Sequence, residues 1–93
     1  MPFLCVFENK LTNPIIVRAV TGQFQWDANI PAGGSAAADP ANNQGLVEGD
    51  RMILVFDGLT PSHMVTFLKV KIDKAMTFKI KPNVIEVIPP LNP

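Results

Sequence analysis

Hydrophobic and polar side chains alternate most regularly in residues 66–72 and 76–80 of the chain. In both segments apolar side chains fall on one side of an extended backbone, and lysines fall on the other. A period of two residues predicts strands with one buried face. Because only residues 73–75 separate the two segments, we predict that they pair as a β-hairpin with an apolar face and a lysine face.

Other apolar segments have the length and composition of strands. They are rich in β-branched and aromatic residues and are separated by turn sequences that contain Gly, Pro and Asn. Residues 51–57 are the most apolar and predict a central strand covered on both faces, while residues 15–20 are expected to pair antiparallel with the first strand. The further expected strands are residues 3–8, 15–20, 23–26, 51–57 and 84–88.

This pattern predicts an all-β fold, a small and mostly antiparallel β-sandwich or barrel of about seven strands. A chain of 93 residues is expected to form one domain, residues 1–93. Residues 30–45 interrupt the pattern with Gly, Pro and Asn, which predicts a long loop with at most one helical turn. In the expected core, one wall consists of Leu68, Val70, Ile72, Phe78 and Ile80, and the opposite wall of Met52, Leu54 and Phe56.

The composition favours a binding partner. Hydrophobic residues make up 47% of the chain and charged residues 17%, against roughly 25% charged residues in an average soluble domain. A small domain has a large surface for its volume, so apolar patches are expected to be covered by another protein. We expect a second copy of the chain to provide that cover, as in a homo-oligomer.

Charge is balanced overall but unevenly distributed. The formal net charge is zero, which argues against nucleic acid as a partner. Residues 19–66 contain one cation against five carboxylates, whereas residues 67–93 contain five lysines against two carboxylates. Opposed patches of this kind can meet between copies. The candidate interface residues are Lys69, Lys71, Lys79 and Lys81.

The single cysteine, Cys5, rules out a disulfide within the chain and indicates a reducing compartment. The first residues have no basic region, and Glu8 interrupts their apolar run, so we expect no targeting segment and a cytoplasmic location. No apolar run approaches the roughly 20 residues that a membrane-spanning helix needs.

Two kinds of ligand site are considered. Trp26 is interpreted either as a core residue or as an exposed platform for a sugar ring, which would make the protein lectin-like together with residues 30–45. The candidate ligand-binding residues are Trp26, Asn42, Asn43 and Asp50. Oxygen donors at Asp39, Glu48 and Asp50 suit calcium, but their spacing does not match an EF-hand loop, so we expect a solvated acidic loop without a metal.

Catalytic groups are few, because the chain has one His, one Cys and no Tyr. Cys5 lies in an apolar strand without nearby cations, and His63 precedes a strand, so neither indicates a nucleophilic pair. The opening Met-Pro resembles the tautomerase family, which implies that Pro2 acts as a base. That family has a long helix after its first strand, however, whereas residues 9–14 have turn chemistry.

These observations favour a non-enzymatic binding or assembly module without a cofactor, which associates with itself as a particle or phage structural component or as an accessory subunit. A lectin-like carbohydrate-binding protein is the alternative hypothesis, and an enzyme using Pro2 or Cys5 is the third.

Overall fold

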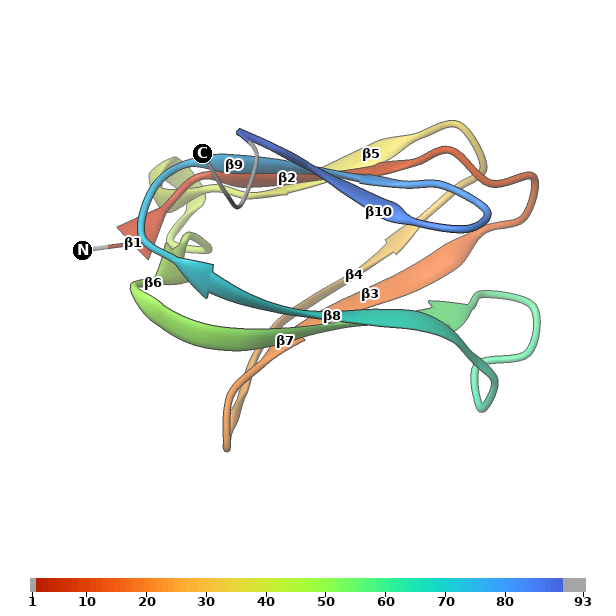
Figure 1. Ribbon diagram of the computed structural model, residues 1–93, viewed down its shortest axis with the longest axis horizontal. Coiled ribbons are helices and arrows are strands. Elements are labelled where there is room, and N and C mark those ends of the chain that lie inside the picture. The colour runs from red at the N-terminus through yellow and green to blue at the C-terminus, as the bar shows by residue number, and fades with distance from the viewer. Residues whose placement is uncertain (1, 90–93) are drawn as a thin grey trace.

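The chain folds into two four-stranded sheets that pack face to face, with the apolar sides of their strands buried between them (Figure 1). This confirms the predicted all-β sandwich. The computed structural model describes residues 2–89, except for the side chain of Phe24. The upper sheet in Figure 1 has the strand order β10-β9-β2-β5, and the lower sheet has the order β4-β3-β7-β8. Within residues 2–89, no helix is long and apolar enough to span a membrane.

The strands have the following bounds. The upper sheet contains β2 (Cys5–Asn9), β5 (Ser35–Ala38), β9 (Met76–Ile80) and β10 (Ile85–Ile88). The lower sheet contains β3 (Ile15–Val20), β4 (Phe24–Ile30), β7 (Gly49–Asp57) and β8 (Met64–Ile72). A short pairing of β1 (Pro2–Phe3) with β6 (Leu46–Val47) lies at one end, and Pro40–Asn42 forms the 3-10 turn η1.

The predicted hairpin is wrong, because its two strands belong to different sheets. β8 is an edge strand that pairs with β7 in the lower sheet. The chain then crosses to the upper sheet, where β9 lies between β10 and β2 (Figure 1). The predicted pairing of the first two strands is also wrong, since β2 pairs with β9 in parallel and with β5. Alternation determines which side of a strand is buried, but it does not identify the neighbouring strand.

The expected core is correct in part. The five side chains predicted for one wall do face the interior, but β8 supplies three of them to the lower sheet and β9 supplies two to the upper sheet. On β7 the predicted face is wrong. Ile53 and Val55 are fully buried, whereas Met52, Leu54 and Phe56 are only half-buried and point outward. An unbroken apolar run contains no polar residue that would mark its outer side.

An aromatic stack joins the two sheets through the core. The Phe7 ring lies 4.9 Å from that of Phe78 on the neighbouring strand and 5.0 Å from that of Trp26 on the opposite sheet, measured between ring centroids. Phe7 and Phe78 are fully buried, and Trp26 is 7% exposed. Stacked rings at this separation add to the stabilisation from buried area.

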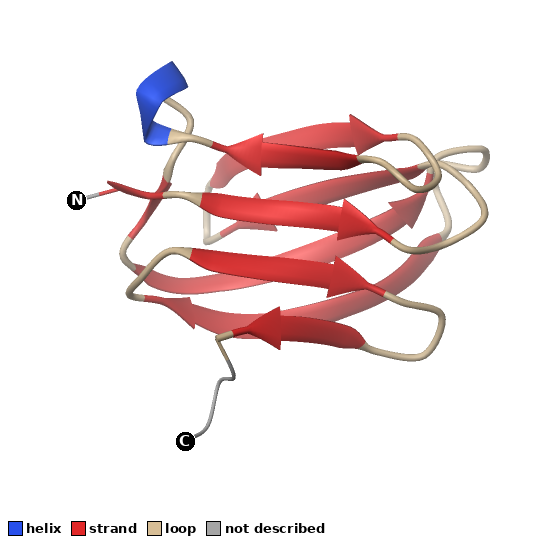
Figure 2. Ribbon diagram, turned by 90° about the horizontal axis from the view of Figure 1, so that it is seen from above, coloured by secondary structure: helices blue, strands red, loops and turns tan. Residues whose placement is uncertain are grey.

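Residues 30–45, predicted as a loop, contain strand β5 and the turn η1 (Figure 2). Ser35–Ala38 completes the upper sheet by pairing antiparallel with β2. Asn9, fully buried at the end of β2, holds this segment in place: its side-chain amide donates to the backbone oxygens of Asn13, Ile30 and Pro31. Alanine has low strand propensity, so tertiary contacts decide the conformation of this segment.

Candidate functional site

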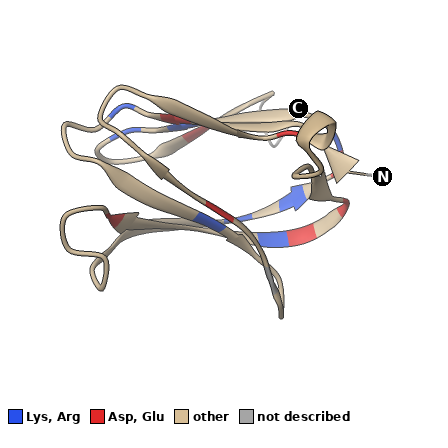
Figure 3. Ribbon diagram, turned by 180° about the vertical axis from the view of Figure 1, so that it is seen from behind, with Lys and Arg blue, Asp and Glu red and all other residues tan. Residues whose placement is uncertain are grey.

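The two outer faces of the sandwich differ in chemistry. On the upper sheet, one row across the strands is polar, at Ser35, Glu8, Lys79 and Glu86, and the next outward row is mostly apolar, at Ala37, Val6, Thr77 and Ile88. On the lower sheet, Arg18 and Asp27 lie opposite each other on β3 and β4, and the outward positions beside them on β3, β7 and β8 are apolar. Figure 3 shows where the charged residues of both sheets lie. We call this surface the apolar face; it consists of Ile16 on β3, Leu54 and Phe56 on β7, and Met64 and Phe67 on β8.

The strand register brings the apolar face together. Ile16 lies opposite Phe56, and Phe56 lies opposite Met64. In the adjacent row Leu54 lies opposite Phe67, whose side chain is 58% exposed. Three side chains of the face are half-buried by their neighbours, and Met64 and Phe67 are exposed. A contiguous, partly exposed apolar surface of this kind on a small protein is a candidate interaction site.

One charged residue lies across the apolar face. The guanidinium of Arg18 is 5.5 Å from the centroid of the Phe56 ring, within the range of a cation–π contact. Its Nε also lies 3.7 Å from a carboxylate oxygen of Asp27 on β4. The ion pair leaves this part of the surface without net charge, so it does not repel an identical surface.

The free edge of β8 is protected against pairing with another strand. Val55 lies opposite Thr66 and Phe56 opposite Met64, so Val65 is an extra residue that forms a β-bulge. Lys69 and Lys71 follow on the same strand and are exposed. Bulges and lysines are the usual devices that prevent edge-to-edge association. Pairing with another strand is therefore disfavoured at the β8 edge, which borders the apolar face.

The structure separates the four candidate interface lysines. Lys69 and Lys71 lie on the lower sheet, whereas Lys79 lies on the outer side of the upper sheet, and Lys81 pairs with Glu86 beyond β9. The neighbouring Lys81 ammonium lowers the pKa of the Glu86 carboxyl. The single lysine face predicted from the sequence is wrong, because it depended on the hairpin.

The candidate ligand-binding residues also lie apart. Trp26 stacks on Phe7 in the core and presents no exposed ring to a sugar. Asn42 and Asn43 are exposed at η1, and Asp50 begins β7. Asp39 caps η1, its Oδ1 accepting a hydrogen bond of 2.9 Å from the amide of Ala41. Among residues 2–89, no three His, Cys, Asp or Glu side chains gather in a group that could hold a metal.

The residues considered for catalysis have different surroundings. His63 is exposed in the β7–β8 loop, and Pro2 is exposed in β1. The helix that the tautomerase resemblance requires is replaced by a turn after β2. Cys5 is fully buried, and burial raises the pKa of its thiol to about 11, against an ordinary value of 9.0. A protonated, inaccessible thiol is not an effective nucleophile at neutral pH.

The Cys5 thiol should make stability depend on pH under alkaline conditions. Because its pKa is higher in the folded state, its contribution to folding is present below pH 9.0 and is lost as the pH rises towards 11. Between pH 8 and pH 10.5 we expect the wild type to lose about 2 kcal/mol more unfolding free energy than Cys5→Ala. Urea titrations of both proteins at the two pH values measure this difference, and parallel pH dependences would contradict it.

Comparisons with protein families, curated proteins and solved structures find no match to this chain. The fold places the chain in the class of small all-β sandwich proteins. The sequence contained a signal for the apolar face, since five consecutive apolar residues, 52–56, are more than one buried side of a strand requires.

Proposed function

We propose that the protein is a non-enzymatic binding or assembly module that associates with a second copy of itself through the apolar face. The observation that carries this proposal is the cluster of outward apolar side chains across β3, β7 and β8, in which Phe67 is 58% exposed. Burying an exposed aromatic side chain contributes strongly to association, and such residues commonly dominate interface energetics.

Three further observations favour a second copy as the partner. The chain has no net charge, a condition that promotes association between copies. The bulge and lysines of β8 oppose pairing at the edge that borders the apolar face, which favours contact through the face itself. Finally, one patch is sufficient for a two-fold symmetric dimer, because the same surface serves both subunits. The buried, reduced Cys5 suits a module that works in the cytoplasm.

Phe67→Ser should weaken self-association. Because Phe67 is exposed in the isolated chain, its replacement should change folding stability little. We expect the dissociation constant of the dimer to rise about tenfold or more, as for truncation of an aromatic contact that the interface buries. Light scattering coupled to size-exclusion chromatography over a range of concentrations measures this change.

Val84→Ser is the matched control, because Val84 is 56% exposed in the turn between β9 and β10, away from the apolar face. It should leave the dissociation constant unchanged. If the wild type remains monomeric at protein concentrations up to about 1 mM, the proposal is refuted. An equal effect of both variants would place the interface elsewhere.

A further inference from the structure

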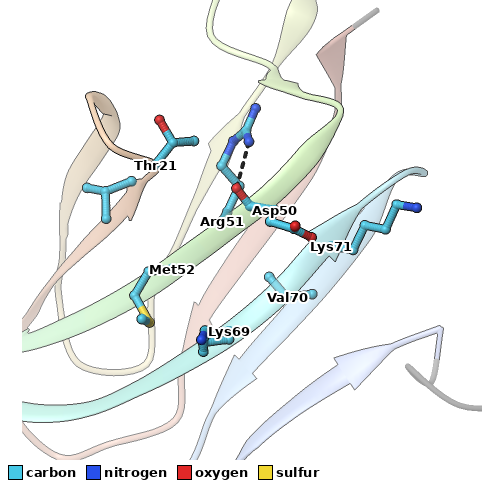
Figure 4. A pocket seen from close by; sticks show the side chains of 8 residues that line it. Thr21, Asp50, Arg51, Met52, Lys69, Val70 and Lys71 are labelled. Carbon is cyan, nitrogen blue, oxygen red and sulfur yellow. Dashed lines mark hydrogen bonds between the residues drawn. The ribbon is translucent and has the colours of Figure 1, made fainter.

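A groove of about 540 Å³ lies on the lower sheet, at the end where the β3–β4 hairpin separates from β7 (Figure 4). This volume falls in the range of small-molecule binding sites. The hairpin contributes one wall, and the beginning of β7 and the end of β8 contribute the rest. The groove is lined by Val20, Thr21, Asp50, Arg51, Met52, Lys69, Val70 and Lys71.

Two features of the sequence shape the groove. The register of β3 with β4 shifts between Ala19 and Val20, and such a bulge increases the local twist of the hairpin. Arg51 then fixes the distance between hairpin and sheet: its Nε donates to Oε1 of Gln25 on β4 at 2.6 Å, and its Nη2 donates to the backbone oxygen of Val47 at 2.6 Å. Arg51 is thus a positioning residue, most of whose donors are already used.

The lining combines an apolar strip with an excess of positive charge. Val20 lies opposite Met52, and Met52 lies opposite Lys69. The three side chains therefore form one row across the strands, in which two apolar residues are followed by a lysine. Of the three cationic residues in the lining, Arg51 is engaged with Gln25 and with backbone oxygens, so Lys69 and Lys71 remain for a ligand, against the one carboxylate of Asp50. Within residues 2–89, no carboxylate lies within 4.0 Å of the ammonium group of Lys69 or Lys71.

The spacing of the two lysines suits a single anionic group. Residues two apart on a strand project from the same face and are separated by about 7 Å. Protection of the β8 edge explains lysines on this strand. It does not explain the apolar strip and the hollow beside them, which provide a place for the non-polar part of a ligand.

We propose that this groove binds a small amphipathic anion, an apolar body that carries one carboxylate. The carboxylate lies between Lys69 and Lys71, and the apolar body lies along Met52 and Val20 towards the hairpin. Asp50, directly opposite Lys71, disfavours a second negative charge on the ligand.

Sodium decanoate, below the concentration at which it forms micelles, is the probe. In amide NMR titrations of isotope-labelled protein, we expect saturable shifts centred on Val20, Thr21 and Met52. Decanol, which has the same chain without the charge, should bind at least about tenfold more weakly. Affinity for decanoate should also fall with added salt, because exposed lysines supply the attraction.

The variant Lys69→Gln/Lys71→Gln should weaken decanoate binding about tenfold. Lys79→Gln is the matched control, since Lys79 carries the same charge on the outer side of the upper sheet, and it should bind as the wild type does. Absence of saturable shifts, equal binding of decanol, or equal loss in the control would overturn the proposal. Binding to phosphatidylserine vesicles without binding to decanoate would also overturn it and indicate a membrane surface instead.

The same titration on Phe67→Ser separates this site from self-association. Phe67 does not line the groove, so the variant should bind decanoate with the affinity of the wild type even when it is monomeric. If binding disappears together with self-association, the groove is not an independent site. Retained binding in a wild type that proves monomeric would refute the proposed assembly function and leave the ligand site standing.

Discussion

Phe7→Ala is expected to lower the free energy of unfolding by about 3–5 kcal/mol, a large part of the roughly 5–15 kcal/mol typical of a small domain. Phe7 is fully buried and its ring contacts both Phe78 and Trp26. Removing the ring forfeits its own burial and leaves a cavity where the two sheets meet. The surrounding strands are held in place by their backbone hydrogen bonds, so they can close this cavity only in part.

Urea denaturation followed by circular dichroism measures the Phe7→Ala effect, since Trp26 fluorescence is itself altered by the loss of its stacking partner. Val6→Ala is the control, because Val6 precedes Phe7 on β2 but points outward and is half-buried. It should cost about 1 kcal/mol or less. A loss for Phe7→Ala no greater than that of the control would show that the stack does not join the sheets as described.

Asn9→Asp is expected to destabilise the protein by about 3 kcal/mol or more at neutral pH, although the two side chains have nearly the same shape. The Asn9 amide nitrogen donates to three backbone oxygens, at 2.8 Å for Asn13 and 3.2 Å for both Ile30 and Pro31. A carboxylate has no donor and would place negative charge against these oxygens. The hydrogen bond that Oδ1 of residue 9 accepts from the backbone amide of Leu11 would remain.

The Asn9→Asp penalty should depend on pH with a defined sign. Burial and the facing carbonyls would raise the folded-state pKa of the new carboxyl group, so its neutral form is favoured in the fold. The deficit relative to wild type should therefore be smallest in acid, below the ordinary pKa of about 4, and should grow as the pH rises. Unfolding titrations of both proteins across this range measure it.

Asn13→Asp provides the matched control for charge. Asn13 is exposed, and it contributes only its backbone oxygen to Asn9, so the substitution should change stability by about 0.5 kcal/mol or less. A pH-independent deficit in Asn9→Asp, or an equal deficit in the control, would contradict the role of the Asn9 amide as the group that holds residues 30–34 against β2.

The proposed interaction surface could be predicted only in part. The sequence predicts a chain with more apolar surface than its core can hide, and the structure places part of that surface on Leu54, Phe56 and Phe67. The prediction placed the first two in the core, because residues 52–56 contain no polar side chain to mark the solvent side. The groove was not predicted, since its wall depends on a bulge and on an arginine that bonds to a residue 26 positions away.

Local pattern by itself determined the class of fold. Alternation in residues 66–72 and 76–80 identified two strands and their buried sides correctly, since the direction of each side chain follows from the two-residue period of an extended backbone. Only the tertiary structure decided which strands are neighbours: β8 joins β7, β9 joins β2, and residues 35–38 form a strand beside them. Partner choice depends on the summed packing of both sheets across the core, and no single segment contains that information.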